Sequence, residues 1–139
     1  MKRLFAPYAS VPKLDLALLS LRVVIGCFML THGLPKMYKL MDGDFAFADP
    51  IGLGAQFSLI LAVITEVLFA FLLIAGFATR IAAFGLLFTL GVAAFIFHSG
   101  DSFSDKESAL LYFVIYTFLF ITGGGKYSCD SLIYKKLKK

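Results

Sequence analysis

The chain has 139 residues, of which 60% are hydrophobic and only 16% are charged, and its mean hydropathy is +0.88. This balance lies outside the range of soluble domains and predicts an integral membrane protein with a single domain. The net charge of +4 does not indicate a nucleic-acid partner, because the basic residues gather at the chain ends and in one short turn, where membrane topology explains them better.

Four apolar runs follow one another along the chain. They cover residues 14–33, 56–77, 81–98 and 105–122. At a rise of 1.5 Å per residue each run is roughly 27–33 Å long as a helix, which matches the hydrocarbon core of a bilayer. The sequence therefore predicts an all-α membrane protein with four transmembrane helices in an antiparallel bundle, a loop over 34–55 and a basic C-terminal tail over 126–139.

Capping residues mark where these helices begin and end. Gly76 is expected to close the second helix in a left-handed conformation, and Thr79 to cap the third, so that the two form a tight hairpin. Asp49-Pro50 has the form of an N-cap followed by proline and predicts a short interfacial helix. A capping box at 104–107 predicts the start of the fourth helix.

The basic residues give the predicted bundle an orientation. With four crossings both termini share one side, and nine basic residues fall there: Lys2, Arg3, Lys13, Arg80, Lys126, Lys135, Lys136, Lys138 and Lys139. The opposite loops carry three: Lys36, Lys39 and Lys106. Because basic residues accumulate on the cytoplasmic side, both termini are expected to be cytoplasmic.

Glu66 lies at the midpoint of the second apolar run. A carboxylate at the centre of a spanning helix costs roughly 2.5–3.5 kcal/mol on insertion, so such residues face protein and commonly mark function. Small and polar residues share its helical stripe. They are Ser58, Ala62, Thr65 and Ala70. Glu66 is therefore expected to point into the bundle.

Arg22 shares one face of the first helix with Gly26 and Gly33, so it belongs to a closely packed seam. Its depth suggests an ion pair with Glu66, because the arginine side chain is long. Tyr116 lies at a similar depth, and a buried phenol needs a partner. The candidate intramembrane polar site is Glu66, Arg22 and Tyr116; the alternative is that these charges only fix the register of the helices.

A second candidate cluster is expected at the outer surface. Its members are His32, Lys36, His98, Lys106 and Glu107. No His-x-x-x-His or similar spacing supports a metal site there. Either it is an ordinary interfacial cluster, or it handles protons or an anionic or quinone headgroup, since histidine titrates near neutral pH. Two histidines near one interface assemble no known catalytic triad, so no catalytic residue is assigned and an enzymatic activity stays open.

Four motifs together resemble the DoxX family of small four-helix membrane proteins. They are residues 32–36 (HGLPK), Glu66 with Gly76 and Thr79-Arg80, His98 with residues 106–112 (KESALLY), and residues 123–130 (GGGKYSCD). The resemblance covers about residues 14–130 and implies a multi-pass protein of the bacterial plasma (inner) membrane. It also implies an association with redox systems, such as a quinone-reducing thiosulfate oxidoreductase or a complex that defends against oxidative stress.

Three functions follow from these observations. The first is an auxiliary or quinone-interacting subunit of a membrane redox system, with quinone as the cofactor and other redox proteins as partners. The second is a proton-coupled carrier of a small solute, which would require a homo-oligomer because four helices leave little room for a path. The third is a non-catalytic scaffold in the lipid bilayer whose tail recruits soluble enzymes.

Overall fold

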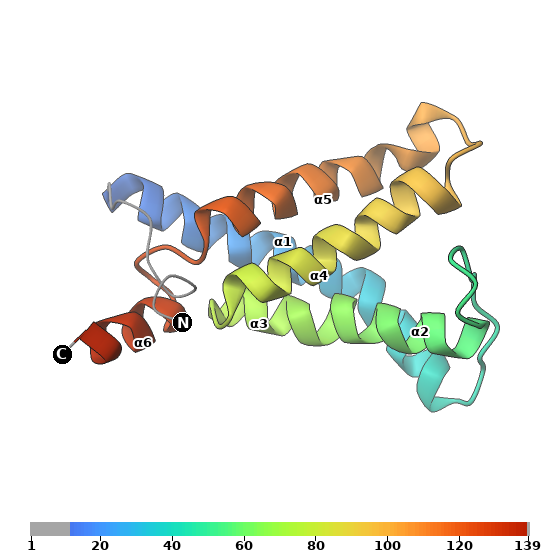
Figure 1. Ribbon diagram of the computed structural model, residues 1–139, viewed down its shortest axis with the longest axis horizontal. Helices are drawn as coiled ribbons and strands as arrows, with labels where there is room; N and C mark the ends of the chain where they lie inside the picture. Colours follow the sequence, from blue (N-terminus) through green and yellow to red (C-terminus); the bar gives the residue numbers. More distant parts are fainter. Residues whose placement is uncertain (1–11, 139) are drawn as a thin grey trace.

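A computed structural model describes residues 12–138, and all regular structure in that range is helical. In chain order the helices are α1 (Pro12–Met41), α2 (Ala55–Val63), η2 (Ile64–Phe69), α3 (Ala70–Ala75), α4 (Thr79–Val92), η3 (Ala93–Phe97), α5 (Phe103–Thr122) and α6 (Cys129–Lys138) (Figure 1). The two η segments are π-helical. Three basic residues of the predicted orientation, Lys2, Arg3 and Lys139, lie outside the described residues.

The chain is a multi-pass membrane protein. Three continuous helical stretches are long and apolar enough to cross a bilayer: Pro12–Met41, Ala55–Ala75, which joins α2, η2 and α3, and Thr79–Phe97, which joins α4 and η3. The fourth long helix, α5, has 20 residues, but charged residues occupy its first turns at 105–107. Because of these charges, the apolar part of α5 is shorter than that of the other three stretches.

α1 is longer than the predicted helix. The sequence indicated an end near residue 33 and a loop over 34–55, whereas α1 continues to Met41 and the loop covers only 42–54. Pro35 lies inside the helix, where it removes one backbone hydrogen bond. The helix continues past it because one tertiary and one local contact hold the last turns: the side chain of Lys36 bonds to Glu66, and Nζ of Lys39 lies 3.4 Å from the carboxylate of Asp44.

α1 packs antiparallel against the rod formed by α2, η2 and α3. Its two glycines make this approach possible, as expected from the seam in the sequence. A Cβ atom at Gly26 would lie 2.5 Å from Ile74, and one at Gly33 would lie 2.8 Å from the backbone of Glu66. Small residues let helix backbones come this close within a membrane. The contacts fix the register, with residue 33 beside 66 and residue 26 beside 74.

The hairpin between α3 and α4 is tight, as expected. Gly76 ends α3 in the left-handed conformation (φ 68°), and Ala78 precedes α4 with φ 46°. We call the end of the bundle that carries this turn and α6 the α6 end, and the end that carries loop 42–54 the loop end. Toward the loop end α4 lies along α5, while α2 lies beside the second half of α1 (Figure 1).

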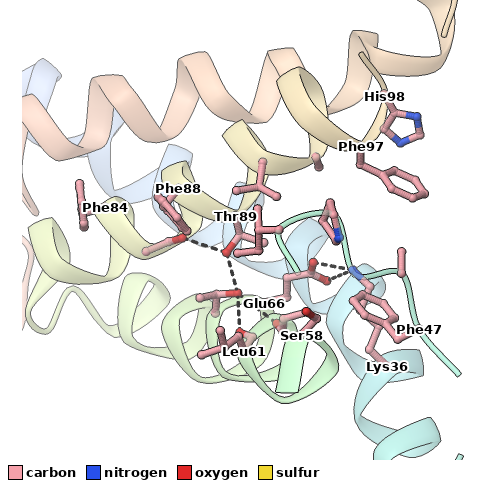
Figure 2. A pocket seen from close by; sticks show the side chains of 18 residues that line it. Lys36, Phe47, Ser58, Leu61, Glu66, Phe84, Phe88, Thr89, Phe97 and His98 are labelled. Atoms are coloured by element: carbon pink, nitrogen blue, oxygen red, sulfur yellow. Dashed lines mark hydrogen bonds and ion pairs between the residues drawn. The ribbon is translucent and has the colours of Figure 1, made fainter. Parts of the chain in front are cut away.

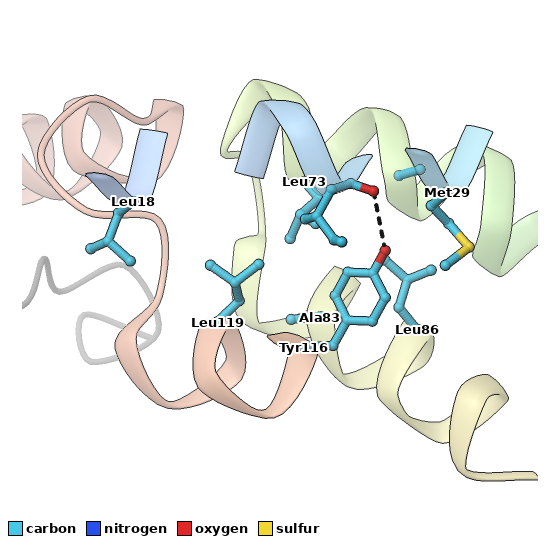
Figure 3. Close-up of a cluster of buried hydrophobic side chains, with 9 residues drawn as sticks. Leu18, Met29, Leu73, Ala83, Leu86, Tyr116 and Leu119 are labelled. Atoms are coloured by element: carbon cyan, nitrogen blue, oxygen red, sulfur yellow. Dashed lines mark hydrogen bonds between the residues drawn. The ribbon is translucent and has the colours of Figure 1, made fainter. Parts of the chain in front are cut away.

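The hydrophobic core draws on all four long stretches. Its fully buried side chains include Leu18, Met29, Leu73, Ala83, Leu86, Tyr116 and Leu119 (Figure 3). The hydroxyl of Tyr116 points to the backbone carbonyl oxygen of Ile25 at 3.5 Å. This packing ties α5 to α1.

Candidate ligand-binding site

Glu66 lies in η2 and is 5% exposed. Its partner is Lys36 of α1, whose ammonium nitrogen donates to both carboxylate oxygens at 2.5 and 2.6 Å. Side chains on a helix lean toward its N-terminus, so Lys36 reaches from the last turns of α1 back into the bundle. The pair neutralises a charge that would be costly at this depth in a membrane.

The prediction of an ion pair between Arg22 and Glu66 is wrong. Arg22 is fully buried and donates from Nη2 to the carbonyl oxygen of Tyr127 at 2.6 Å. Arg22 and Lys36 are 14 residues apart on α1, which is about 21 Å of helix. The antiparallel register therefore brings Arg22 to Gly76 and leaves Glu66 opposite the other end of α1.

A cavity of about 470 Å³ opens beside this ion pair. Lys36 and Glu66 lie at one side of it and point toward each other (Figure 2). One wall comes from α2 and η2: Ser58, Leu61, Ala62 and Thr65. The other comes from α4 and η3: Phe84, Gly85, Phe88, Thr89, Val92, Ala93 and Phe97. Its size falls within the range of sites that bind small molecules.

The walls are apolar and reach the outside of the bundle. Phe84, Phe88 and Phe97 are 54%, 58% and 52% exposed, so one side of the cavity is bounded by residues that face the surroundings of the bundle. Hydroxyl groups interrupt these walls: Thr89 donates to Thr65 at 3.0 Å across the hairpin, and Ser58 lies in the same wall as Thr65. A ligand here would meet hydrocarbon-like side chains over most of its surface and polar groups at one end.

Loop 42–54 covers the loop end of the cavity with Phe47, Ala48, Pro50 and Ile51. The ring of Phe47 lies 5.8 Å from Nζ of Lys36, within the distance for a cation–π contact.

Asp49 fixes this loop to the start of α2. Its carboxylate accepts hydrogen bonds from the amides of Leu53 and Gly54 and from the hydroxyl of Ser58, at 2.7–2.8 Å. The Ser58 hydroxyl and these amides hold the pKa of Asp49 below its ordinary value. The short interfacial helix expected after Asp49 is absent, because the carboxylate binds these donors around a turn at 50–53.

Both walls contain π-helical turns at the cavity. Glu66 and Thr65 belong to η2, and Ala93 and Phe97 belong to η3. A π-helical turn inserts an extra residue into an α-helix and is frequently found at functional sites. Two of them on facing helices single out this cavity within the described chain.

Two residues of the expected outer cluster, Lys36 and His98, lie at the cavity, and the other three have other contacts or are exposed. His98 lies at the cavity with Nδ1 2.7 Å from Asp101, whereas His32 packs its ring edge-on against Tyr112. Lys106 donates to the carbonyl of Ser99 at 3.4 Å, and Glu107 is exposed. Of the cluster, only Lys36 and His98 line the cavity. Among residues 12–138 no three histidine, cysteine or acidic side chains group as metal ligands.

A second buried polar set lies at the α6 end and was missed by the sequence analysis. Asp130 of α6 accepts hydrogen bonds from the amides of Ala78 and Thr79 at 2.7 and 2.8 Å, and so caps α4. Asp15 of α1 likewise accepts from the amide of Lys126 at 2.9 Å. The only signal in the sequence was the position of Asp130 at the end of the 123–130 motif, which gave no partner.

Comparison with known proteins gives two matches. A family model described as DoxX matches residues 17–99. An uncharacterized protein of Haemophilus influenzae is 30% identical over 127 residues, which cover 84% of this chain and 90% of that protein. No solved structure matches.

Proposed function

This chain belongs to the DoxX family of membrane proteins, and from that premise we propose that it is a quinone-binding subunit of a membrane-associated redox system. The proposal rests on one observation: the cavity with apolar walls that begins at the outside of the bundle and ends at the Lys36–Glu66 ion pair. A quinone is divided in the same way as the cavity. Its apolar isoprenoid tail partitions into lipid, and its polar headgroup carries two carbonyl oxygens.

The ion pair supplies both kinds of hydrogen bond that the two redox states of such a headgroup require. The Lys36 ammonium is a donor and suits a quinone carbonyl oxygen, while the Glu66 carboxylate is an acceptor and suits a quinol hydroxyl. The walls of Phe88 and Phe97 suit the ring and the first isoprene units. Arg22 and Tyr116, which the sequence grouped with Glu66, have no role at this site because they do not line the cavity.

The proposed setting is the bacterial inner membrane, with α5 as the fourth crossing. The exposed charges at the α6 end are basic, whereas loop 42–54 contains no basic residue, which supports cytoplasmic termini. A reporter that functions in the cytoplasm should then be active when fused to the C-terminus, and a reporter that functions only outside the membrane should be inactive there. The reverse result would contradict this orientation.

Two alternatives make different predictions about the same cavity. In a proton-coupled carrier, Glu66 would bind protons alternately from the two sides, and the chain would act as a homo-oligomer. In a scaffold, the ion pair would only hold helix register, and α6 would recruit soluble enzymes. The quinone proposal is favoured over both because neither of them requires a lipid-facing cavity at the ion pair.

The test is the amount of quinone that the purified full chain retains from native membranes, extracted and quantified by mass spectrometry. Ala93→Phe fills the cavity without a change of charge and should reduce retained quinone at least tenfold. Lys36→Gln should do the same, while Lys39→Gln, on the same helix outside the cavity, should not. Wild-type protein without quinone, or equal retention by all variants, would overturn the proposal.

A further inference from the structure

A second hollow, of about 440 Å³, lies at the α6 end between the last turn of α3 and α6. Its apolar lining includes Ala75, Tyr127 and Leu132, and its basic residues are Lys126 and Lys135. Ala75 is the last residue of the second spanning stretch. The hollow therefore lies at the level where a bilayer changes from hydrocarbon to headgroups.

The segment that forms this hollow is held in place by buried hydrogen bonds. Arg22 donates to the carbonyl oxygen of Tyr127, and the amide of Asp130 donates to the carbonyl oxygen of Gly76 at 2.9 Å. The hydroxyl of Ser128 donates to the carbonyl oxygen of Gly125 at 2.6 Å. With the cap that Asp130 provides to α4, these contacts fix the start of α6 against both α1 and the hairpin.

The exposed charges around the hollow have one sign. Within the described part of this end, the acidic residues Asp15 and Asp130 are 2% and 5% exposed, and both accept hydrogen bonds from backbone amides. The basic residues Lys126 and Lys135 are exposed, and two further exposed lysines, Lys136 and Lys138, follow on α6. Tyr127 and Leu132, 50% and 60% exposed, supply the apolar part.

We propose that this hollow binds an anionic glycerophospholipid of the adjacent leaflet. The phosphodiester bridges Lys126 and Lys135, the glycerol ester region packs against Tyr127, and the acyl chains continue along α3 from Ala75. The charge of the lysines and the depth set by Ala75 favour this occupant, since basic residues near a membrane surface attract anionic lipid. The lipid would join α6 to the spanning bundle.

The experiment is a titration of the purified full chain in mild detergent with phosphatidylglycerol or phosphatidylcholine, read by native mass spectrometry. Phosphatidylglycerol should bind in preference. The double variant Lys126→Gln with Lys135→Gln should weaken its binding about 30-fold, because each lysine contributes about a fivefold factor. Lys136→Gln with Lys138→Gln removes the same charge outside the hollow and should leave binding within about threefold of wild type.

Two results would overturn the proposal: equal binding of the two lipids by the wild-type protein, or equal losses in the two double variants, which would mean diffuse attraction to the lysines of α6. Both lysines of the hollow are exposed, so their substitution should leave the helical circular dichroism unchanged. If the double variant is unstable, Lys135→Gln alone should still lower phosphatidylglycerol binding about fivefold. An unchanged affinity in that variant would also contradict the site.

Discussion

Lys36 and Glu66 come from different helices and meet with both carboxylate oxygens of Glu66 within 2.6 Å of the same ammonium nitrogen. The carboxylate side chain is 7% exposed and that of Lys36 is 29% exposed, so this ion pair is buried on one side only. It holds the end of α1 against η2 and leaves the ammonium at the edge of the cavity.

Removal of one partner should destabilise the protein more than removal of both. Lys36→Met leaves an unpaired buried carboxylate and should cost about 3 kcal/mol of unfolding free energy, near the lower end for a broken buried pair. Glu66→Gln should cost a similar amount, and the double variant less than either single variant. Unfolding in mixed micelles with a rising denaturant fraction measures these changes. Strictly additive losses would show that the two charges do not interact.

Gly76→Ala should destabilise the protein more than a glycine-to-alanine substitution in a turn of similar backbone conformation. A Cβ atom at position 76 would overlap the guanidinium of Arg22, and the left-handed backbone costs on the order of 1–2 kcal/mol in addition. Gly52 has a similar φ of 74° with nothing near its Cβ position, so Gly52→Ala carries only the backbone cost. We expect the variants to differ by a further 1–3 kcal/mol, a typical overpacking penalty. Equal stabilities would show that Arg22 moves aside freely.

Asp130→Ala should release α6 from the hairpin. The substitution removes two hydrogen bonds to the first amides of α4 and should cost about 2 kcal/mol, the upper end for the loss of a helix cap. Trypsin cleavage after Lys126 in the folded protein should become faster, because this peptide bond adjoins the segment 127–130, which Asp130 fixes against the hairpin. Asp105→Ala, at the exposed start of α5, is the control and should not change the cleavage rate.

Acid should loosen loop 42–54. The pKa of Asp49 is depressed in the folded protein by its hydrogen bonds from Ser58 and two amides, so its contribution to stability is complete above the unfolded value of about 3.9. That contribution is lost as the pH falls through the lower folded value. Amide exchange at Leu53 and Gly54, compared with more stable helical amides, should therefore rise below about pH 4. In Asp49→Asn this rise should be absent.

The sequence predicted the parts of the structure that depend on local pattern. Apolar length identified the three stretches that qualify as membrane spans, and the glycine spacing of α1 identified the face that packs against Glu66 and Ile74. The left-handed Gly76 was also predicted, because glycine readily adopts that conformation at a helix end. Each of these features involves residues close in sequence or a simple periodicity.

The features that could not be predicted from the sequence depend on how the helices are aligned with one another. The first apolar run ended at residue 33, and that placed Lys36 in a surface cluster, although α1 continues and turns Lys36 toward Glu66. The estimated depth of Arg22 was compatible with an ion pair to Glu66, because the sequence does not give the offset between the two helices. The observed offset excludes that pair. Asp130 could not be joined to α4 for the same reason, since the contact spans 51 residues.

The central claim is that a quinone headgroup occupies the cavity at the Lys36–Glu66 pair, and photolabelling with an azidoquinone in native membranes tests it most directly. The label should fall on residues 58–66 and 84–97, be displaced by excess unlabelled quinone, and decline in Ala93→Phe. Labelling spread over lipid-facing positions such as Phe28 and Val114, without displacement, would contradict the claim.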